Sequence, residues 1–207
     1  MDVKWQSVVK NLNLKDQWKK LYDIKKPSNY PGLWAKGTNH KYEHVLIEIE
    51  KILKIYNIKT VTDCGCGNFF WMNKLNFGET KYLGCDIVDD LIIENKKKYP
   101  DKEFRVLDLT KEIPPKSDLL FIRSVFVHLE NKYILSALEN IKKSGSKYLL
   151  TSFSPHLKVN EDTSCIMLRK INLLVAPFNF PKPVYNIEEV PGLPEVKCLG
   201  LWEVKDL

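Results

Sequence analysis

The sequence lacks any long apolar run. No segment approaches the ~18 uninterrupted apolar residues that a membrane-spanning helix needs. Residues 1–18 also lack the continuous apolar stretch of a signal peptide. We therefore expect neither a membrane span nor export, and a cytoplasmic location.

Cysteine is too sparse and too irregularly spaced for a disulfide framework. The chain has five cysteines, an odd number. They are Cys64, Cys66, Cys85, Cys165 and Cys198. A structural zinc site normally takes two clusters of ligands, each spaced by about two to four residues, and the Cys64–Cys66 pair has no such counterpart. We expect reduced thiols and no metal.

A third glycine is missing from the sharpest local motif. Residues 61–68 read VTDCGCGN, an apolar strand that ends in a carboxylate and turns through two glycines. A dinucleotide fingerprint would need another glycine where Phe70 stands. This absence argues against a nicotinamide-dependent oxidoreductase.

Strong charge of one sign is also lacking. The formal net charge is +6, and the lysines are scattered, with one unbroken triplet at residues 96–98. Such a net charge affects the solubility of the protein and the electrostatic attraction of charged ligands, and it indicates little about function. A nucleic-acid-binding module remains an alternative, in which Tyr30 and Trp34 stack bases beside lysines. Salt-dependent retention on RNA would distinguish it.

What the sequence does contain is an alternation of short apolar strands with helical segments. At 207 residues and 44% hydrophobic content, one main core is expected. The expected strands are residues 59–63, 81–85, 103–107, 118–122 and 147–153, and the expected helices are residues 42–56, 69–75, 89–98 and 131–143. This alternation predicts a parallel sheet covered on both faces.

Two further segments lie outside this alternation. Strands at residues 184–189 and 196–204 are joined by a short link, which makes an antiparallel hairpin. We therefore predict a seven-stranded, mostly parallel α/β sheet whose last strand is antiparallel. Residues 1–41, amphipathic helices and a loop, are expected to form a lid on the domain of residues 42–207. Residues 154–183 are a long irregular excursion, and such loops are usually functional.

Carboxylates end three successive predicted strands. They are Asp63, Asp86 and Asp108. Because the carboxyl ends of parallel strands share one edge, the three side chains should outline one crevice. Taken singly, Asp63 is also typical of a helix cap, and Asp86 and Asp108 of ordinary loop carboxylates.

These segments resemble the class I S-adenosylmethionine-dependent methyltransferases, which have a Rossmann-like fold. The run DCGCGNFFWM at residues 63–72 is similar to a bacterial-type subgroup of small-molecule methyltransferases. The resemblance runs from about residue 34 to the C-terminus, through YLGCDIV at 82–88, RSVFVHL at 123–129 and APFN at 176–179. Two positions depart from it: Phe69 replaces a common glycine, and Ser124 replaces a common acidic residue.

The resemblance implies a cofactor site for S-adenosylmethionine. Asp63, Gly65 and Gly67 would surround its methionine part, Asp86 beside Ile87 would hold the ribose, Asp108 and Leu109 would border the adenine, and Arg123 would lie on the sulfonium side.

The expected activity is methyl transfer to a small acceptor, such as a sugar or another hydroxyl metabolite. His128 is the candidate general base, since an imidazole with a pKa near ~6.5 is largely neutral at neutral pH; the competing interpretation is a structural histidine. Residues 34–38 and 154–179 are expected to wall the acceptor pocket. Its candidate residues are Trp34, Asn160, Asp162, Arg169, Asn172 and Phe178. An RNA or cap methyltransferase and a non-catalytic cofactor-binding module are the alternatives.

Overall fold

The computed structural model describes residues 9, 11–24, 43–164, 166, 168–189, 191–192 and 196–207. The helices are α2 (Leu14–Ile24), α3 (Glu43–Ile55), α4 (Asp89–Lys98) and α5 (Asn131–Lys143). Short 3-10 turns are η3 (Met72–Lys74), η4 (Phe126–His128) and η5 (Val204–Asp206). The strands are β1 (Thr60–Cys64), β2 (Lys81–Asp86), β3 (Glu103–Val106), β4 (Leu119–Ile122), β5 (Tyr148–Phe153), β6 (Tyr185–Glu188) and β7 (Cys198–Glu203).

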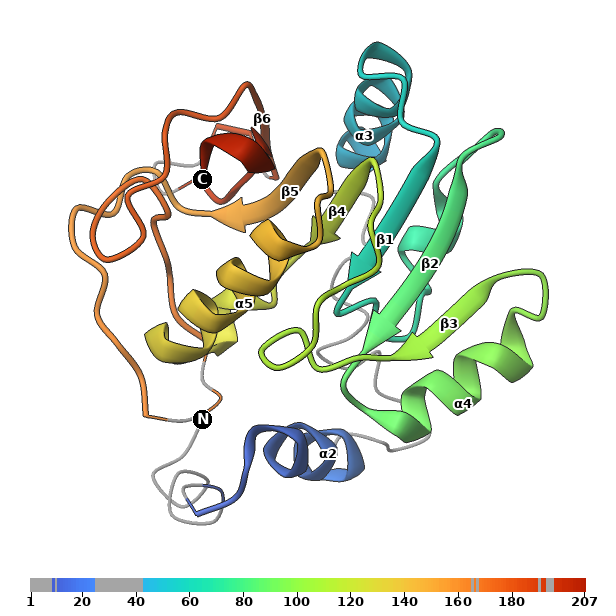
Figure 1. Cartoon of the computed structure of the whole chain (residues 1–207), viewed down its shortest axis with the longest axis horizontal. Coiled ribbons are helices and arrows are strands. Elements are labelled where there is room, and N and C mark those ends of the chain that lie inside the picture. The colour runs from blue at the N-terminus through green and yellow to red at the C-terminus, as the bar shows by residue number, and fades with distance from the viewer. Residues whose placement is uncertain are drawn as a thin grey trace.

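The seven strands form one sheet in the order β3-β2-β1-β4-β5-β7-β6 (Figure 1). β1 to β5 run parallel to one another. β7 runs antiparallel to both β5 and β6. The predicted mostly parallel sheet with an antiparallel last strand is therefore confirmed.

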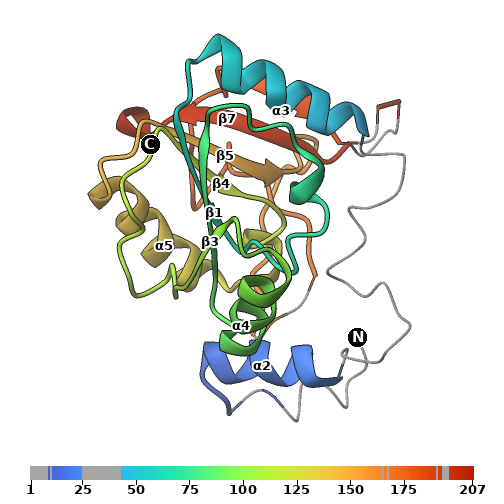
Figure 2. The ribbon, with the colours of Figure 1, turned by 90° about the vertical axis from the view of Figure 1, so that its right-hand side faces the viewer.

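Alternate residues of β4 build the cores on the two faces of the sheet. Leu120 and Ile122 pack with α5 in one core, whereas Leu119 and Phe121 pack with α3 in the other. All four side chains are buried, as expected for a central parallel strand covered on both faces. Figure 2 shows α3 and α5 on opposite sides of the sheet.

The helix expected at residues 69–75 is absent, and that prediction was wrong. Phe69 has a φ of 56°, a left-handed conformation that interrupts a right-handed helix. Its buried ring lies 4.7 Å from the ring of Tyr82 and 5.3 Å from that of Phe104 between centroids. Aromatic packing of this kind offsets the backbone cost, so the segment forms only turns and the short η3.

α2 lies against α4 at the edge of the molecule (Figure 1). Lys15 Nζ is 2.8 Å from a carboxylate oxygen of Asp89, and Tyr22 Oη donates to Glu94 Oε2 at 2.6 Å. On its other side, Gln17 Oε1 accepts from the amide of Ile166 at 3.2 Å. The helical part of the expected lid therefore contacts both α4 and the irregular excursion. The loop part, residues 26–41, lies outside the described residues.

Two buried or partly buried amides organise the irregular excursion. Asn160 Nδ2 donates to the carbonyls of Asn172 and Ala176 at 2.8 and 2.9 Å, and Asn160 Oδ1 accepts from the amide of Asn172 at 2.8 Å. Asn172 Nδ2 donates to the carbonyl of Leu157 at 2.7 Å. These side chains take the place of strand partners, because buried backbone groups need hydrogen bonds.

Replacing Asn172 by alanine should lower the free energy of unfolding by about 1–3 kcal/mol, because backbone groups of the excursion lose their partners. Urea denaturation measures this change. The matched control is Asn73→Ala, at an exposed position of η3, which should change the free energy by less than about 0.5 kcal/mol. Equal stabilities of the two variants would contradict the structural role of Asn172.

Candidate functional site

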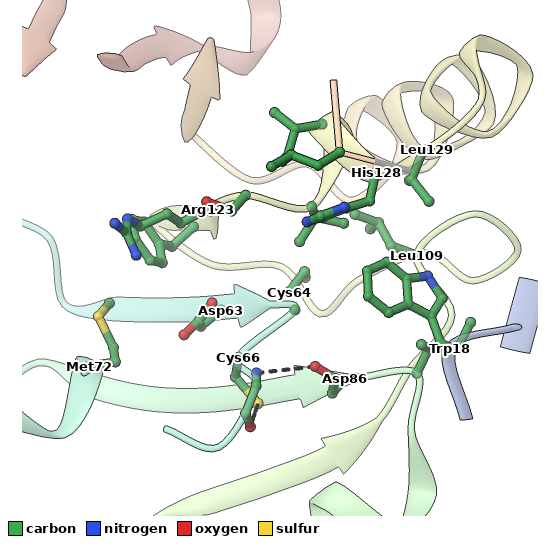
Figure 3. A pocket seen from close by; sticks show the side chains of 18 of the residues that line it. Trp18, Asp63, Cys64, Cys66, Met72, Asp86, Leu109, Arg123, His128 and Leu129 are labelled. Atoms are coloured by element: carbon green, nitrogen blue, oxygen red, sulfur yellow. Dashed lines mark hydrogen bonds between the residues drawn. The ribbon is translucent and has the colours of Figure 1, made fainter. Parts of the chain in front are cut away.

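A cavity of about 640 Å³ opens at the carboxyl edge of the parallel strands. Its size falls in the range of small-molecule sites, roughly 300–1,000 Å³. Side chains from the ends of β1, β2 and β4, from the segment after β3, from α2 and from the ends of the β6–β7 hairpin line it. Figure 3 shows Asp63, Asp86, Arg123, His128 and Trp18 around this space. Ligands of open α/β sheets bind at this edge.

The glycine loop after β1 is held against β2. The amides of Gly65 and Cys66 both donate to the carbonyl of Cys85, at 2.7 and 2.9 Å. Gly65 has a φ of 91°, and a Cβ there would lie 2.3 Å from Cγ2 of Val125. Only glycine combines this conformation with this close approach.

The next turn of the loop is held by side chains. The amide of Gly67 donates to Asp86 Oδ2 at 3.1 Å, and its carbonyl accepts from Asn95 Nδ2 at 2.7 Å. Because the amides of Gly65, Cys66 and Gly67 are hydrogen-bonded within the protein, the loop shapes the cavity and does not offer the free N–H groups of a helix N-terminus.

Asp63 and Asp86 are buried carboxylates beside the cavity. Burial raises the pKa of Asp63 to about 7, with Asp86 adding to the rise, while the hydroxyl of Tyr82, 2.8 Å from Asp63 Oδ2, opposes it. Burial likewise raises the pKa of Asp86 to about 6, against the amides of Val88 and Gly67. Such shifts mean that the negative forms are costly until a hydrogen-bond donor or a cation arrives.

Asp108 is the third expected acid, and it lines the same cavity. Its Oδ1 accepts from the amide and the hydroxyl of Thr110, at 3.0 and 2.6 Å. The apolar side chains of Ile87 and Leu109 also line the cavity. The structure therefore brings together all eight expected cofactor residues: Asp63, Gly65, Gly67, Asp86, Ile87, Asp108, Leu109 and Arg123.

Arg123 belongs to a buried ionic group that the sequence analysis missed. Its Nη2 donates to Glu189 Oε2 at 2.7 Å, and its guanidinium lies 4.4 Å from the ring centroid of Trp71. Lys197 Nζ lies 3.1 Å from Glu189 Oε1 and donates to Ser124 Oγ at 2.6 Å. Burial raises the pKa of Glu189, but the attraction of Arg123 and Lys197 outweighs burial and lowers it overall.

The position of Glu189 and Lys197 in the β6–β7 hairpin was a signal that they belong to the site. β6 is parallel to β5 and β7 is antiparallel to it, so the residue after β6 and the residue before β7 lie at the carboxyl edge. The amide of Glu189 donates to the carbonyl of Lys197 at 2.8 Å, which holds the two together. A charged pair that closes such a hairpin is therefore a candidate for the site.

His128 also lines the cavity. It ends η4, its side chain is buried, and its ring meets that of Trp18 edge-on at 5.5 Å between centroids. Arg169 lines the same wall, and its Nη2 donates to the carbonyl of Leu129 and to Asn131 Oδ1, both at 2.7 Å. The position of His128 is compatible with the expected proton transfer.

The other expected acceptor residues in the described ranges do not line the cavity. They make contacts that hold the fold together. Asn160 and Asn172 hold the excursion, Asp162 Oδ1 accepts from the amide of Asn131 at 2.8 Å at the start of α5, and Phe178 is buried in the core on the α5 face. Trp34 lies outside the described residues, as does Tyr30. The excursion still contributes to the cavity through Ser154, Leu168, Arg169 and Lys170.

The cysteines in the described ranges are free thiols: Cys64, Cys66, Cys85 and Cys198. Burial raises the pKa of Cys66 far above its usual value, which is typical of inert core thiols. Across the described residues, no group of three or more metal-ligating side chains is placed to hold a metal ion. In the same part of the chain, no helix has the length and apolar character needed to cross a membrane.

No family model matches the sequence. Over 105 residues the chain is 32% identical to protein 235L of Invertebrate iridescent virus 6, whose name describes it provisionally as a methyltransferase. The match covers 48% of this chain and 40% of the viral protein. The chain therefore spans less than half the length of this curated relative.

Solved structures match over nearly the whole chain. Magnesium protoporphyrin IX methyltransferase from Synechocystis PCC 6803, with bound S-adenosylhomocysteine, has a TM-score of 0.61 at 14% identity, over 95% of this chain and 98% of that one. A TehB-like S-adenosylmethionine-dependent methyltransferase from Corynebacterium glutamicum has a TM-score of 0.55 at 18% identity, over 90% and 96%.

Fold and cavity thus define a Rossmann-like α/β protein with a ligand crevice at the carboxyl edge of its sheet. The fold is that of solved S-adenosylmethionine-dependent methyltransferases, so the fold that the resemblance in the sequence implied is confirmed.

Proposed function

We propose that this protein binds S-adenosylmethionine and transfers its methyl group to a small acceptor, such as a sugar or another hydroxyl metabolite. The observation that carries the proposal is the placement of Asp63, Asp86 and Asp108 along one cavity at three successive strand ends. The bound S-adenosylmethionine of the Synechocystis enzyme, which has the same fold, supports the choice of cofactor.

The residues around the cavity fit this cofactor. Asp63, buried and costly to ionise, suits a cationic group. Asp86 suits the ribose hydroxyls, which can donate hydrogen bonds to its carboxylate, and Leu109 beside Asp108 offers an apolar surface to the adenine. When bound, S-adenosylmethionine supplies a methyl group on a positively charged sulfur, which makes the methyl carbon electrophilic.

The remaining contributions come from the chain itself. Leu14, Trp18 and Leu21 of α2 line the cavity and present apolar surface to it. Positioning of the acceptor against the cofactor can then supply much of the catalysis. His128 would accept the proton of an acceptor hydroxyl as its oxygen attacks.

The first test is calorimetry with S-adenosylmethionine. Asp86→Ala should weaken binding by about 1.5–3 kcal/mol, the scale of a charge-assisted hydrogen bond. The matched control is Asp101→Ala, because Asp101 is 72% exposed and pairs only locally with Lys102 among the described contacts. Unchanged affinity in a folded Asp86→Ala protein would reject the ribose contact, and failure of the wild type to bind would reject the cofactor.

Affinity for S-adenosylmethionine should also depend on pH through Asp63. With a pKa of about 7, this carboxyl is mostly protonated at lower pH and mostly ionised at higher pH. A cationic ligand prefers the ionised form, so affinity should rise by several-fold between about pH 6 and about pH 7.5. Asp86, with a pKa of about 6, adds to the rise at the lower end of that range.

Asp63→Asn is the reference for this pH titration, because the charges of the ligand itself change equally for both proteins. The ratio of the wild-type affinity to the variant affinity should rise with pH. A constant ratio across the range would show that Asp63 does not titrate against the ligand.

Replacement of His128 by asparagine tests the proton acceptor. Asparagine keeps a polar side chain but cannot take a proton, so turnover of a hydroxyl acceptor should fall by roughly 10²–10⁴-fold with cofactor affinity intact. His156→Asn is the control, since His156 does not line the cavity. A loss of less than a few-fold would make His128 a structural histidine.

A further inference from the structure

The cavity has a second polar group, in which Arg123, one of the expected cofactor residues, meets Glu189 and Lys197. The sheet order β3-β2-β1-β4-β5-β7-β6 places the strands of the three aspartates together on one side. Glu189 follows β6 and Lys197 precedes β7, and these strands lie at the other end of the order. Arg123 follows β4, which pairs with β1, so Arg123 lies between the aspartates and the end that carries Glu189 and Lys197.

The charge of this second end does not cancel. Glu189 is 2% exposed, and Arg123, Lys197 and the hydroxyl of Ser152, at 3.3 Å, all bind its carboxylate. Among Arg123, Glu189 and Lys197, one carboxylate thus accompanies two cations, and burial opposes the charge of Lys197. Buried charge without full compensation is costly, and an incoming anion would relieve that cost.

Lys197 is the more exposed of the two cations, and both line the cavity. Its side chain is 36% exposed, against 15% for Arg123. An ammonium group has three donors; Ser124 Oγ at 2.6 Å and Glu189 Oε1 at 3.1 Å orient it. Burial lowers the pKa of Lys197 and Glu189 opposes that change, as expected for a lysine in a partly desolvated pocket.

The backbone of Ser124 also points to a ligand site beside Lys197. Its φ is 59°, an uncommon left-handed conformation for a residue with a side chain. The amide of Ser124 donates to Ser152 Oγ at 3.0 Å. This hydrogen bond helps to hold the hydroxyl of Ser124 against Lys197. Strain of this kind persists where the surroundings enforce it, often at ligand sites.

We propose that Lys197, oriented by Glu189 and Ser124, binds a carboxylate group of the methyl acceptor, so that the acceptor is an anionic small molecule. This rests on the proposed function, because it assigns the acidic end of the cavity to the cofactor. S-adenosylmethionine also carries a carboxylate, in its amino-acid part, which Lys197 could bind. The experiment must distinguish this carboxylate from that of the acceptor.

The main experiment compares benzoate with benzamide, which have similar size but differ in charge. Calorimetry or ligand-observed NMR measures both affinities with S-adenosylhomocysteine present in excess. The wild type should prefer benzoate by about tenfold or more, the scale of one charge-assisted hydrogen bond. Lys197→Met should lose this preference, and Lys197→Arg should keep most of it.

Lys143→Met is the matched control, because it removes the same charge from a side chain on α5 that is 61% exposed. It should leave the preference unchanged. If Lys197→Met does not fold, Lys197→Gln, which keeps a polar contact with Ser124, replaces it. No preference in the wild type, or the same preference after either substitution, would overturn the proposal.

A second measurement identifies the source of the carboxylate. S-adenosylhomocysteine and 5′-methylthioadenosine share the nucleoside, but only the first has the amino-acid part. If Lys197→Met weakens the first about tenfold and leaves the second unchanged, Lys197 binds the cofactor and the acceptor proposal is overturned. Equal effects on the two nucleosides support the acceptor.

Failure of the wild type to bind either nucleoside would reject the proposed function by itself. The comparison of benzoate with benzamide, repeated without nucleoside, would then still decide whether Lys197 forms a carboxylate site.

Discussion

The site depends on the paired hydrogen bonds from Gly65 and Cys66 to the carbonyl of Cys85. They tie the loop after β1 to β2, and the amide of Gly67 then reaches Asp86. The close approach of Val125 to Gly65 ties the same loop to the segment after β4. One short loop therefore ties together the ends of β1, β2 and β4, and the positions of Asp63 and Asp86 depend on that arrangement.

The spacing of apolar residues in the sequence correctly predicted the elements that depend mainly on that spacing. The predicted helices at residues 89–98 and 131–143 match α4 and α5, because apolar spacing alone defines their buried faces. The strands and the antiparallel hairpin followed from the same reasoning. The predicted helix at residues 69–75 was wrong, because the ring of Phe69 packs against β2 and β3, and that tertiary contact overrides helical propensity.

Side-chain roles in irregular segments were harder to predict. Asn160 and Asn172 were interpreted as acceptor contacts because polar side chains in a long loop are typical of binding sites. In the structure their amides bind backbone groups of the loop itself. Glu189 and Lys197 were missed for the opposite reason: their importance comes from Arg123, 66 positions from Glu189 in sequence. A single sequence does not reveal the pairing with Arg123, although the position of the two residues at the closed end of the hairpin was a signal for the site.

The electrostatics of the cavity follow from strand order and burial together. The acids at the ends of β1 and β2 have raised pKa values, because burial penalises their charge. Glu189 is just as buried, yet its pKa is lowered, because two cations accompany it. The same desolvation therefore leaves one end of the cavity short of positive charge and the other end short of negative charge. A ligand that is cationic at one point and a second ligand that is anionic would each be drawn to a different end.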